Sequence, residues 1–207
     1  MNAAANCELI VFAKAPLPGL SKTRLIPALG AAGAAALAER LLEHAVAVGM
    51  SAGFAGVELC AAPDASHPAF ARLLLRHDGL ELGEQGDGDL GARMHRALKR
   101  RTARGRPVLL IGTDSPELDA AALGAAARAI ADHDAVFVPA LDGGYALVGL
   151  TRPQACLFDN VAWSTSQVMV ETRERARRAG LRWAEMPAVA DIDVPADLIN
   201  LPSGWLP

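Results

Sequence analysis

The sequence predicts an α/β domain of three layers, in which helices cover both faces of a mostly parallel central sheet. Three observations lead to this fold class. Short apolar segments alternate with longer helical segments along the 207 residues, as they do in βαβ units. The apolar segments lack the polar–apolar alternation of a half-exposed strand, which indicates strands covered on both faces. Loops of unusual composition follow these strands, at the edge where such sheets bind ligands.

The first third of the chain predicts two strands and two helices. Residues 8–13 form a continuous apolar run that is typical of a buried strand. A Pro- and Gly-rich loop over 14–27 precedes a helix over about 29–48, whose apolar residues recur on one face. A second strand over 56–61 and a short helix over 68–77 follow.

The middle third contains the most apolar strand. A short strand over 80–82 and a Gly/Asp loop lead into a helix over about 90–103, with Arg and Lys on its exposed side. Residues 107–111 are then almost entirely apolar, which predicts a central strand. Its loop over 112–116 enters a helix near 118–131.

The last third continues the alternation. A strand is predicted over 135–138, and residues 145–150 either extend it or form the second arm of a hairpin. A helix near 166–179, a strand over 181–185 and a short helix after Pro195 complete the chain.

The bulk properties indicate one globular domain over residues 1–207. A hydrophobic fraction of 52% and a charged fraction of 21% are ordinary for such a domain. The net charge of -3 and the pI near 5.9 argue against nucleic-acid binding, which needs a basic face. They leave room for a small anionic ligand held by a local basic loop.

The sequence indicates a cytoplasmic protein. Cys7, Cys60 and Cys156 are scattered and odd in number, as expected of reduced thiols. The early apolar run is too short for a signal peptide. Charged residues interrupt the Ala-rich segment 31–50, so we do not expect a membrane span. A homo-oligomer is compatible with the sequence.

The loop after the first strand carries three cations and no acid: Lys14, Lys22 and Arg24. Lys and Arg suit phosphate oxygens, Lys as a point charge and Arg through two parallel hydrogen bonds. The loop is not a Walker A motif, because Pro16 and Ser21 stand where that motif needs Gly. The alternative is a solvated basic loop before a helix. Its place after a strand favours phosphate binding.

A second loop, residues 86–91, matches the pattern G-x-G-x-x-G. A dinucleotide site here would set Asp87 and Asp89 against a pyrophosphate, and the loop lies far from the first βα turn. We therefore favour a turn in which Asp89 caps the following helix.

Asp114 follows the central strand and should project into the ligand crevice. Mg²⁺ is usually held by one or two carboxylates together with substrate phosphates, so Asp114 is a candidate metal ligand. The alternative is that Asp114 or Ser115 only caps the next helix.

Two more motifs contain carboxylates. In Asp142-Gly-Gly-Tyr145, the glycines allow close approach to a ligand and equally allow a hairpin turn. Asp191 and Asp193 share one side of an extended segment, where they could supply a second metal ligand or cap the final helix.

Taken together, six motifs resemble one known family. They are A-K-x-P-x-P-G-x-x-K-T-R-L, Q-G-x-G-D-L-G-x-R-M, G-T-D-S-P-x-L, D-G-G-Y-x-L-x-G-L, W-S-T and D-x-D-x-P-x-D-L. In this order, from Ile10 to Leu201, they resemble the selenodomain-associated transferase 1 family. That group is placed with the nucleotide-diphospho-sugar transferases, which have the glycosyltransferase-A fold.

The resemblance implies that Mg²⁺ or Mn²⁺ is bound by Asp114 and Asp193. It implies that phosphates contact Lys22 and Arg24, so that Lys22, Arg24 and Asp114 carry catalysis. The base would be bordered by Gln85, Gly86, Leu90 and Gly91. The sugar or acceptor would face Asp142, Gly143, Gly144 and Tyr145.

The resemblance leaves three functions open. The first is nucleotidyl transfer from a nucleoside triphosphate to a small-molecule acceptor, with release of pyrophosphate. The second is glycosyl transfer from a nucleotide-sugar, and the third is nucleotide binding without catalysis. The usual L-A-A-G-G-x-x-x-R-M loop of nucleotidyltransferases is absent. Asp114 is also not part of a D-x-D of the kind found in sugar transferases, because positions 112 and 116 are Gly112 and Pro116.

Overall fold

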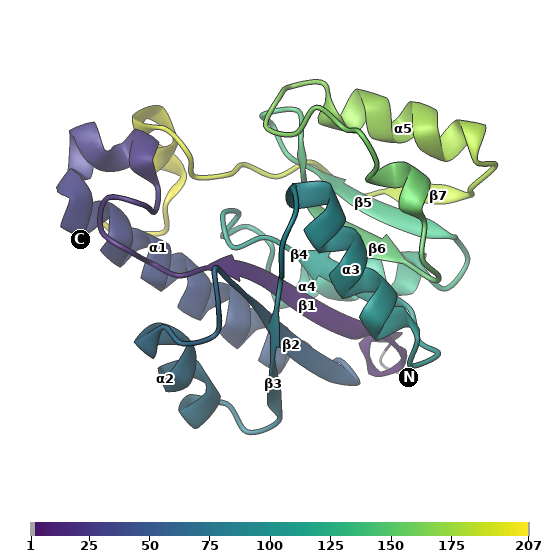
Figure 1. Ribbon diagram of the computed structural model, residues 1–207, viewed down its shortest axis with the longest axis horizontal. Helices are drawn as coiled ribbons and strands as arrows, with labels where there is room; N and C mark the ends of the chain where they lie inside the picture. The colour runs from purple at the N-terminus through teal and green to yellow at the C-terminus, as the bar shows by residue number, and fades with distance from the viewer. Residues whose placement is uncertain (1–2, 207) are drawn as a thin grey trace.

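The computed structural model describes residues 3–206, and its strands form one seven-stranded sheet (Figure 1). The strands are β1 (Glu8–Lys14), β2 (Gly56–Ala62), β3 (Leu80–Glu84), β4 (Val108–Ile111), β5 (Ala135–Pro139), β6 (Tyr145–Leu150) and β7 (Trp183–Glu185). Their spatial order is β3-β2-β1-β4-β6-β5-β7, which places β4 at the centre. Each strand that the sequence predicts is present.

The sheet is parallel except for β6. Strand β6 runs antiparallel to both β4 and β5, so residues 145–150 form the second arm of a hairpin with β5. The pairs β1–β2, β1–β4, β2–β3 and β5–β7 are all parallel. The carboxyl ends of six strands and the start of β6 therefore lie along one edge of the sheet.

Helices cover both faces of the sheet, as the sequence predicts. They are α1 (Ile26–Ser51), α2 (Pro68–Arg76), α3 (Leu90–Thr102), α4 (Ala120–Ala129) and α5 (Val168–Arg178), with short 3-10 helices η1 (Ala3–Asn6), η2 (Thr23–Leu25), η3 (Ala155–Leu157) and η4 (Pro195–Asn200). Helices α1, α2 and α4 contribute to one core layer, and α3 and α5 to the other. In Figure 1, α3 lies in front of the sheet and α1 behind it.

Successive residues of the strands enter opposite core layers. In β1, Leu9 and Val11 pack with the layer of α1, whereas Ile10 packs with the layer of α3. All three are fully buried. Because both faces are covered, each strand reads as a continuous apolar run rather than an alternating one.

Helix α1 is longer than the sequence indicates. Pro27 lies in its first turn, where the missing N–H costs nothing. Gly30 has φ 70° and ψ 167°, so the helix is kinked there. By length and composition alone the segment Thr23–Ser51 could cross a membrane, but several of its apolar side chains, such as Leu42 and Val46, pack in the core of the domain.

A third core cluster joins the start of α1 to the C-terminal segment. Its buried members include Leu25, Leu37 and Ile192, and Leu198 and Trp205 pack against them. This cluster brings residues near position 192 beside the loop that follows β1. Helix η4 is the short helix predicted after Pro195.

Candidate functional site

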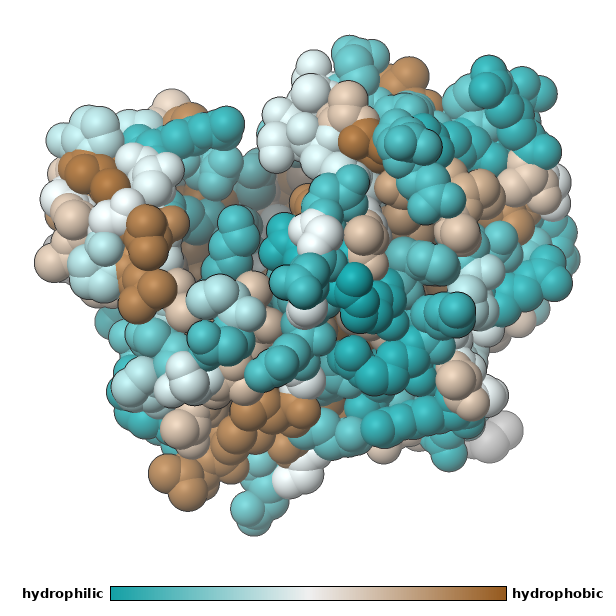
Figure 2. Space-filling model, viewed as in Figure 1, coloured by the Kyte–Doolittle hydropathy of each residue, from teal (hydrophilic) through white to brown (hydrophobic). Residues whose placement is uncertain are grey.

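A cleft with a volume of about 550 Å³ lies along the carboxyl edge of the sheet. Residues that follow β1, β4 and β5, and the first residues of β6, line it. Figure 2 shows the molecule hollowed between the end formed by the start of α1 with the C-terminal segment and the end that carries α5. The edge predicted to bind ligands is therefore the edge that is open.

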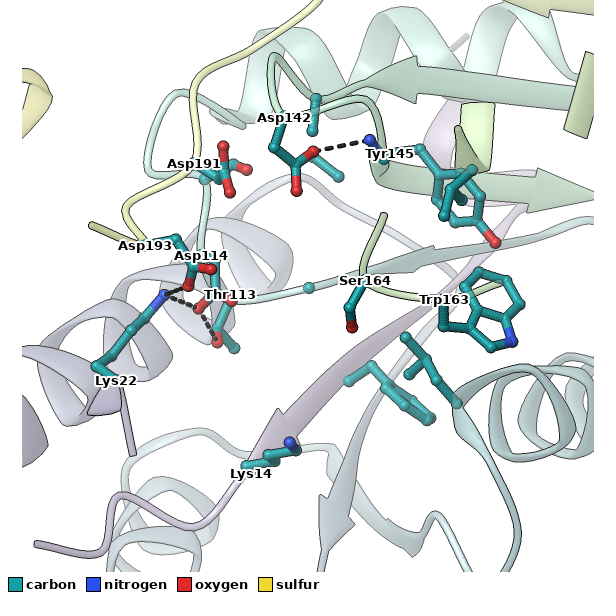
Figure 3. Close-up of a pocket in the computed structure, with 18 of the residues that line it drawn as sticks. Lys14, Lys22, Thr113, Asp114, Asp142, Tyr145, Trp163, Ser164, Asp191 and Asp193 are labelled. Carbon is teal, nitrogen blue, oxygen red and sulfur yellow. Dashed lines mark hydrogen bonds and ion pairs between the residues drawn. The ribbon is translucent and has the colours of Figure 1, made fainter. Parts of the chain in front are cut away.

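The Lys22 side chain points toward Asp114 and Asp193 in this cleft (Figure 3). Its Nζ is 2.7 Å from Asp114 Oδ1 and 3.4 Å from Asp193 Oδ1, and it donates a hydrogen bond to the Ile192 carbonyl at 2.5 Å. The side chain is only 6% exposed. Three oxygens from two distant segments thus surround one ammonium group.

The loop that carries Lys22 has a defined shape. Ser21 Oγ donates to the Ala15 carbonyl and accepts a hydrogen bond from the Leu17 N–H, both at 2.9 Å. Lys22 itself has a left-handed backbone with φ 47°, which is strained for a residue other than Gly. Its neighbour Arg24 contacts Asp193 Oδ2 at 3.0 Å. Lys22 and Arg24 therefore line the same cleft as Asp114.

Asp114 is free to face the cleft because another residue caps the next helix. The cap of α4 is Asp119, whose Oδ1 accepts a hydrogen bond from the Ala122 N–H at 2.8 Å. The helix begins at Ala120 rather than near residue 118, so the interpretation of Asp114 or Ser115 as its cap is wrong.

Asp193 is held in place by its neighbours in the chain. Ile192 is fully buried, and its N–H donates to the Asp114 carbonyl at 2.9 Å. The Asp197 carboxylate accepts hydrogen bonds from the N–H groups of Asp193 and Val194, each at 2.8 Å. Asp197 therefore caps η4, which leaves the carboxylate of Asp193 for Lys22 and Arg24.

Asp114 and Asp193 lie on the same ammonium group, which brings the two carboxylates near each other. Their Oδ1 atoms lie no farther apart than the sum of their two distances to Lys22 Nζ. Two oxygens that share Mg²⁺ lie within roughly 4 Å of each other, which a small side-chain movement could reach. Within residues 3–206, no group of three or more His, Cys, Asp or Glu side chains is arranged to hold a metal ion alone. The pair fits a cation whose remaining ligands come from phosphates, provided that Lys22 moves away.

Two other carboxylates line the cleft, Asp142 and Asp191. Asp142 Oδ1 accepts a hydrogen bond from the Gly144 N–H at 2.7 Å, within the turn between β5 and β6. Burial raises the pKa of Asp191 above its ordinary value, and the negative charge of Asp142 raises it further. The hairpin interpretation of Asp142-Gly-Gly-Tyr145 is thus confirmed, with a carboxylate left facing the cavity.

The predicted base-binding residues divide into two groups. Gln85 and Leu90 line the cleft, whereas Gly86 and Gly91 do not appear among its lining residues. Gln85 joins three elements, because its Nε2 donates to the carbonyls of Ala13 and Cys60 and its Oε1 accepts from Arg93. Asp89 caps α3, as predicted.

Two of the predicted glycines allow close packing instead. A Cβ atom on Gly91 would lie 2.4 Å from the Phe158 carbonyl oxygen and 2.8 Å from the indole of Trp163. A Cβ atom on Gly143 would lie 2.3 Å from the Ser166 carbonyl oxygen. Both positions therefore support the loop around residue 163 rather than the cavity itself.

Of the aromatic residues in the cleft, the sequence predicts Tyr145 but not Phe12 or Trp163. Trp163 and Tyr145 meet edge to face, with ring centroids 6.3 Å apart, and Phe12 lines the cavity with them. Burial raises the pKa of Tyr145, so its hydroxyl stays protonated at neutral pH. The W-S-T motif was the available signal for Trp163, but nothing local to it indicates a position opposite Tyr145.

Residues 45–165, more than half of the chain, match a family described as uncharacterised proteins conserved in bacteria (DUF2064). The chain belongs to this family. A comparison of the DUF2064 chain with curated proteins gives no match.

Solved structures share the fold of this DUF2064 chain. One is a protein from Desulfovibrio desulfuricans G20, provisionally described as a nucleotide-diphospho-sugar transferase, with 29% identity over 97% of this chain and 90% of that one and a TM-score of 0.85. Another is 4-diphosphocytidyl-2C-methyl-D-erythritol synthase from Anaerococcus prevotii DSM 20548, with 12% identity over 96% and 95% and a TM-score of 0.62. The inositol-1-phosphate CTP transferase from T. maritima has 13% identity over 96% and 93% and a TM-score of 0.56.

The DUF2064 chain therefore has the nucleotide-diphospho-sugar transferase fold that the sequence predicts. At 12% and 13% identity, the last two similarities concern the fold alone. The narrower resemblance to selenodomain-associated transferase 1 proteins stays a prediction.

Proposed function

We propose that this chain is a nucleotidyltransferase that uses Mg²⁺ or Mn²⁺ with a nucleoside triphosphate and releases pyrophosphate. One observation carries the proposal: the Lys22 ammonium lies between Asp114 and Asp193 at the carboxyl edge of the sheet. This contact marks a position where the chain stabilises positive charge. Other cations line the cleft nearby, which suits a ligand that carries several phosphates.

Each of the charged residues of the cleft has a proposed role. Asp114 and Asp193 would hold the metal ion, with phosphate oxygens as further ligands. When bound, the ion neutralises charge on the triphosphate and on the leaving pyrophosphate. Lys22 would move from the carboxylates to the phosphates, where Lys14 and Arg24 would also bind. Leu90 would lie against the base, beside Phe12.

The transfer itself needs no covalent intermediate. An oxygen of the acceptor forms a bond to the α-phosphorus, and the bond from that phosphorus to the pyrophosphate oxygen breaks. If the acceptor oxygen belongs to a hydroxyl group, its proton leaves to water or to a carboxylate of the cleft. Fixed positive charge around the phosphates stabilises the charge that develops in the transition state.

Glycosyl transfer is the second candidate. The similar protein from Desulfovibrio desulfuricans G20 is provisionally described as a nucleotide-diphospho-sugar transferase. The same cations and carboxylates would then hold the diphosphate of a nucleotide-sugar, and the leaving group would be a nucleoside diphosphate.

Ligand-induced thermal stabilisation tests the proposal. Nucleoside triphosphates and nucleotide-sugars are screened with and without Mg²⁺ or Mn²⁺. A ligand at a hundred times its Kd adds about 2.7 kcal/mol, which raises the Tm of a chain of this size by roughly 5–10 °C. The shift should require the metal and should shrink in Lys22→Ala. Lys99→Ala is the matched control, because Lys99 is an exposed lysine on α3 away from the cleft.

The products separate the two candidates. Pyrophosphate from a nucleoside triphosphate identifies nucleotidyl transfer, and a nucleoside diphosphate from a nucleotide-sugar identifies glycosyl transfer. If no nucleotide stabilises the protein, or if Lys22→Ala responds as Lys99→Ala does, the proposal is wrong.

A further inference from the structure

The two walls of the cleft carry opposite charges. The wall formed by residues before position 116 has four cations, Lys14, Lys22, Arg24 and Arg93, and a single carboxylate, Asp114. The wall formed by residues after position 139 has only carboxylates among its charged lining residues within the described chain. Its members Asp142, Tyr145, Trp163, Ser164 and Asp191 are called the acidic wall below. Figure 3 shows Lys14 and Asp142 on opposite sides of the cavity.

The carboxylates of the acidic wall have no cation beside them. Asp193 is paired with Lys22 and Arg24, but neither Asp142 nor Asp191 forms an ion pair with any residue in the range 3–206. Both carboxylates line the same cavity. Carboxylates that line a cavity without a cationic partner in the protein are free to accept hydrogen bonds from a ligand.

The fold does not need the charge of Asp142. Its hydrogen bond from the Gly144 N–H shapes the turn between β5 and β6. An Asn side chain makes the same contact in such turns without a negative charge. The negative charge of Asp142 is therefore not required by this contact and is available to a ligand.

The rest of the acidic wall is aromatic and hydroxylic. Tyr145 and Trp163 line the cavity and pack edge to face with each other, and aromatic rings of this kind suit the C–H face of a small ring or chain. In Figure 3, Ser164 lies between Asp142 and Lys14, and its backbone has a φ of 63°. Its hydroxyl makes no hydrogen bond with the described residues and so remains available to a ligand.

We propose that the acidic wall is the subsite of the second substrate, and that this substrate is a polyhydroxy compound that is uncharged or carries an amine. The assignment rests on the proposed function, which places the nucleotide phosphates on the opposite wall, against Lys14, Lys22 and Arg24. Hydroxyl and ammonium groups donate hydrogen bonds to Asp142 and Asp191. A phosphate or carboxylate group is repelled by both, and no cation of the acidic wall compensates it.

Three compounds with one carbon skeleton test the charge preference: glucose, glucosamine and glucose 6-phosphate. Their binding to the whole chain is measured by ligand-observed NMR titration at pH 7.5, first without divalent metal and then with Mg²⁺. We expect glucosamine and glucose to bind at least about tenfold more tightly than glucose 6-phosphate. In Asp142→Asn and Asp191→Asn, the preference for glucosamine over glucose 6-phosphate should fall by about tenfold.

Asp78→Asn is the matched control, because Asp78 is exposed, lies outside the cleft and carries the same charge. The proposal is overturned if glucose 6-phosphate binds as tightly as glucosamine, if Asp142→Asn and Asp191→Asn behave like Asp78→Asn, or if none of the three compounds binds. Mg²⁺-dependent binding of glucose 6-phosphate that is lost in Asp142→Asn or Asp191→Asn but kept in Asp78→Asn would assign the two carboxylates to a metal ion and also overturn it. Nucleotide binding, measured on the same samples, decides the proposed function separately.

Discussion

At the scale of single residues, Lys22 determines how the charged part of the cleft is arranged. Its ammonium compensates Asp114 and Asp193, which would otherwise repel each other. The same two carboxylates are the proposed metal ligands. Lys22 and a divalent cation therefore compete for the same oxygens, and phosphates relieve the competition by giving Lys22 another partner.

Replacing Lys22 by Met keeps most of the stem and removes the charge. We expect Lys22→Met to bind Mn²⁺ about tenfold more tightly than wild type in the absence of nucleotide, because the competing cation is gone. Nucleotide should bind more weakly, because a phosphate ligand is lost. Free Mn²⁺ is measured by electron paramagnetic resonance, with Lys99→Met as the control. Mn²⁺ binding that is unchanged or weaker in Lys22→Met would contradict the competition between Lys22 and the metal ion.

The sequence could predict part of this site and not the rest. The cations at 14, 22 and 24 and the carboxylate at 114 follow strands, so the rule for the carboxyl ends of parallel strands places them together. The pairing with Asp193 depends on burial of Ile192 against α1, more than 140 residues away in the chain. No local pattern contains that information.

At the scale of elements, the start of α3 and the loop around Trp163 are packed against each other through Gly91. The sequence predicts correctly that α3 begins near Leu90 and that Asp89 caps it. The family resemblance assigns Gly91 to the base, and no local pattern shows that Phe158 and Trp163 lie beside it. Gly91 instead sets how closely the aromatic part of the cleft approaches α3.

A pair of Gly→Ala substitutions tests this packing. Gly91→Ala should destabilise the chain by about 1–3 kcal/mol, because the added methyl group meets backbone that must shift. Gly124→Ala, in the interior of α4, should stabilise it by about 0.5–1 kcal/mol, since its Cβ would contact only the flexible Arg128 side chain at 3.6 Å. Urea unfolding measures both. If the two substitutions change the free energy of unfolding equally, the close packing of Gly91 against the loop does not contribute to stability.

At the scale of the whole molecule, the predicted fold and strands are confirmed. They could be predicted because strands covered on both faces form long apolar runs, which are distinctive in a sequence. A buried ion cluster between α3 and strands β1 to β3 was not predicted. Arg101 is 0% exposed and contacts Glu8 at 2.5 Å, Glu58 at 3.5 Å and Glu81 at 2.9 Å. An arginine in a helix usually lies on a solvated face. Arg101 is buried because three neighbouring strands place carboxylates around it, and this arrangement is visible only in the folded sheet.

This cluster makes the stability of the whole chain depend on pH. Hydrogen bonds from Arg104, with the charge of Arg101, lower the pKa of Glu81 from 4.5 to about 2. The folded state therefore favours the ionised form, and the resulting stabilisation is complete above about pH 4.5 and is lost as the pH falls toward 2. Urea unfolding is measured from above pH 4.5 down toward pH 2. At the upper end Glu81→Gln should be less stable than wild type, and on acidification it should lose less of its free energy of unfolding than wild type does. Glu84→Gln, at an exposed carboxylate of the same strand, should follow wild type. If the two variants lose stability in parallel, the ion cluster is not the source of the acid sensitivity.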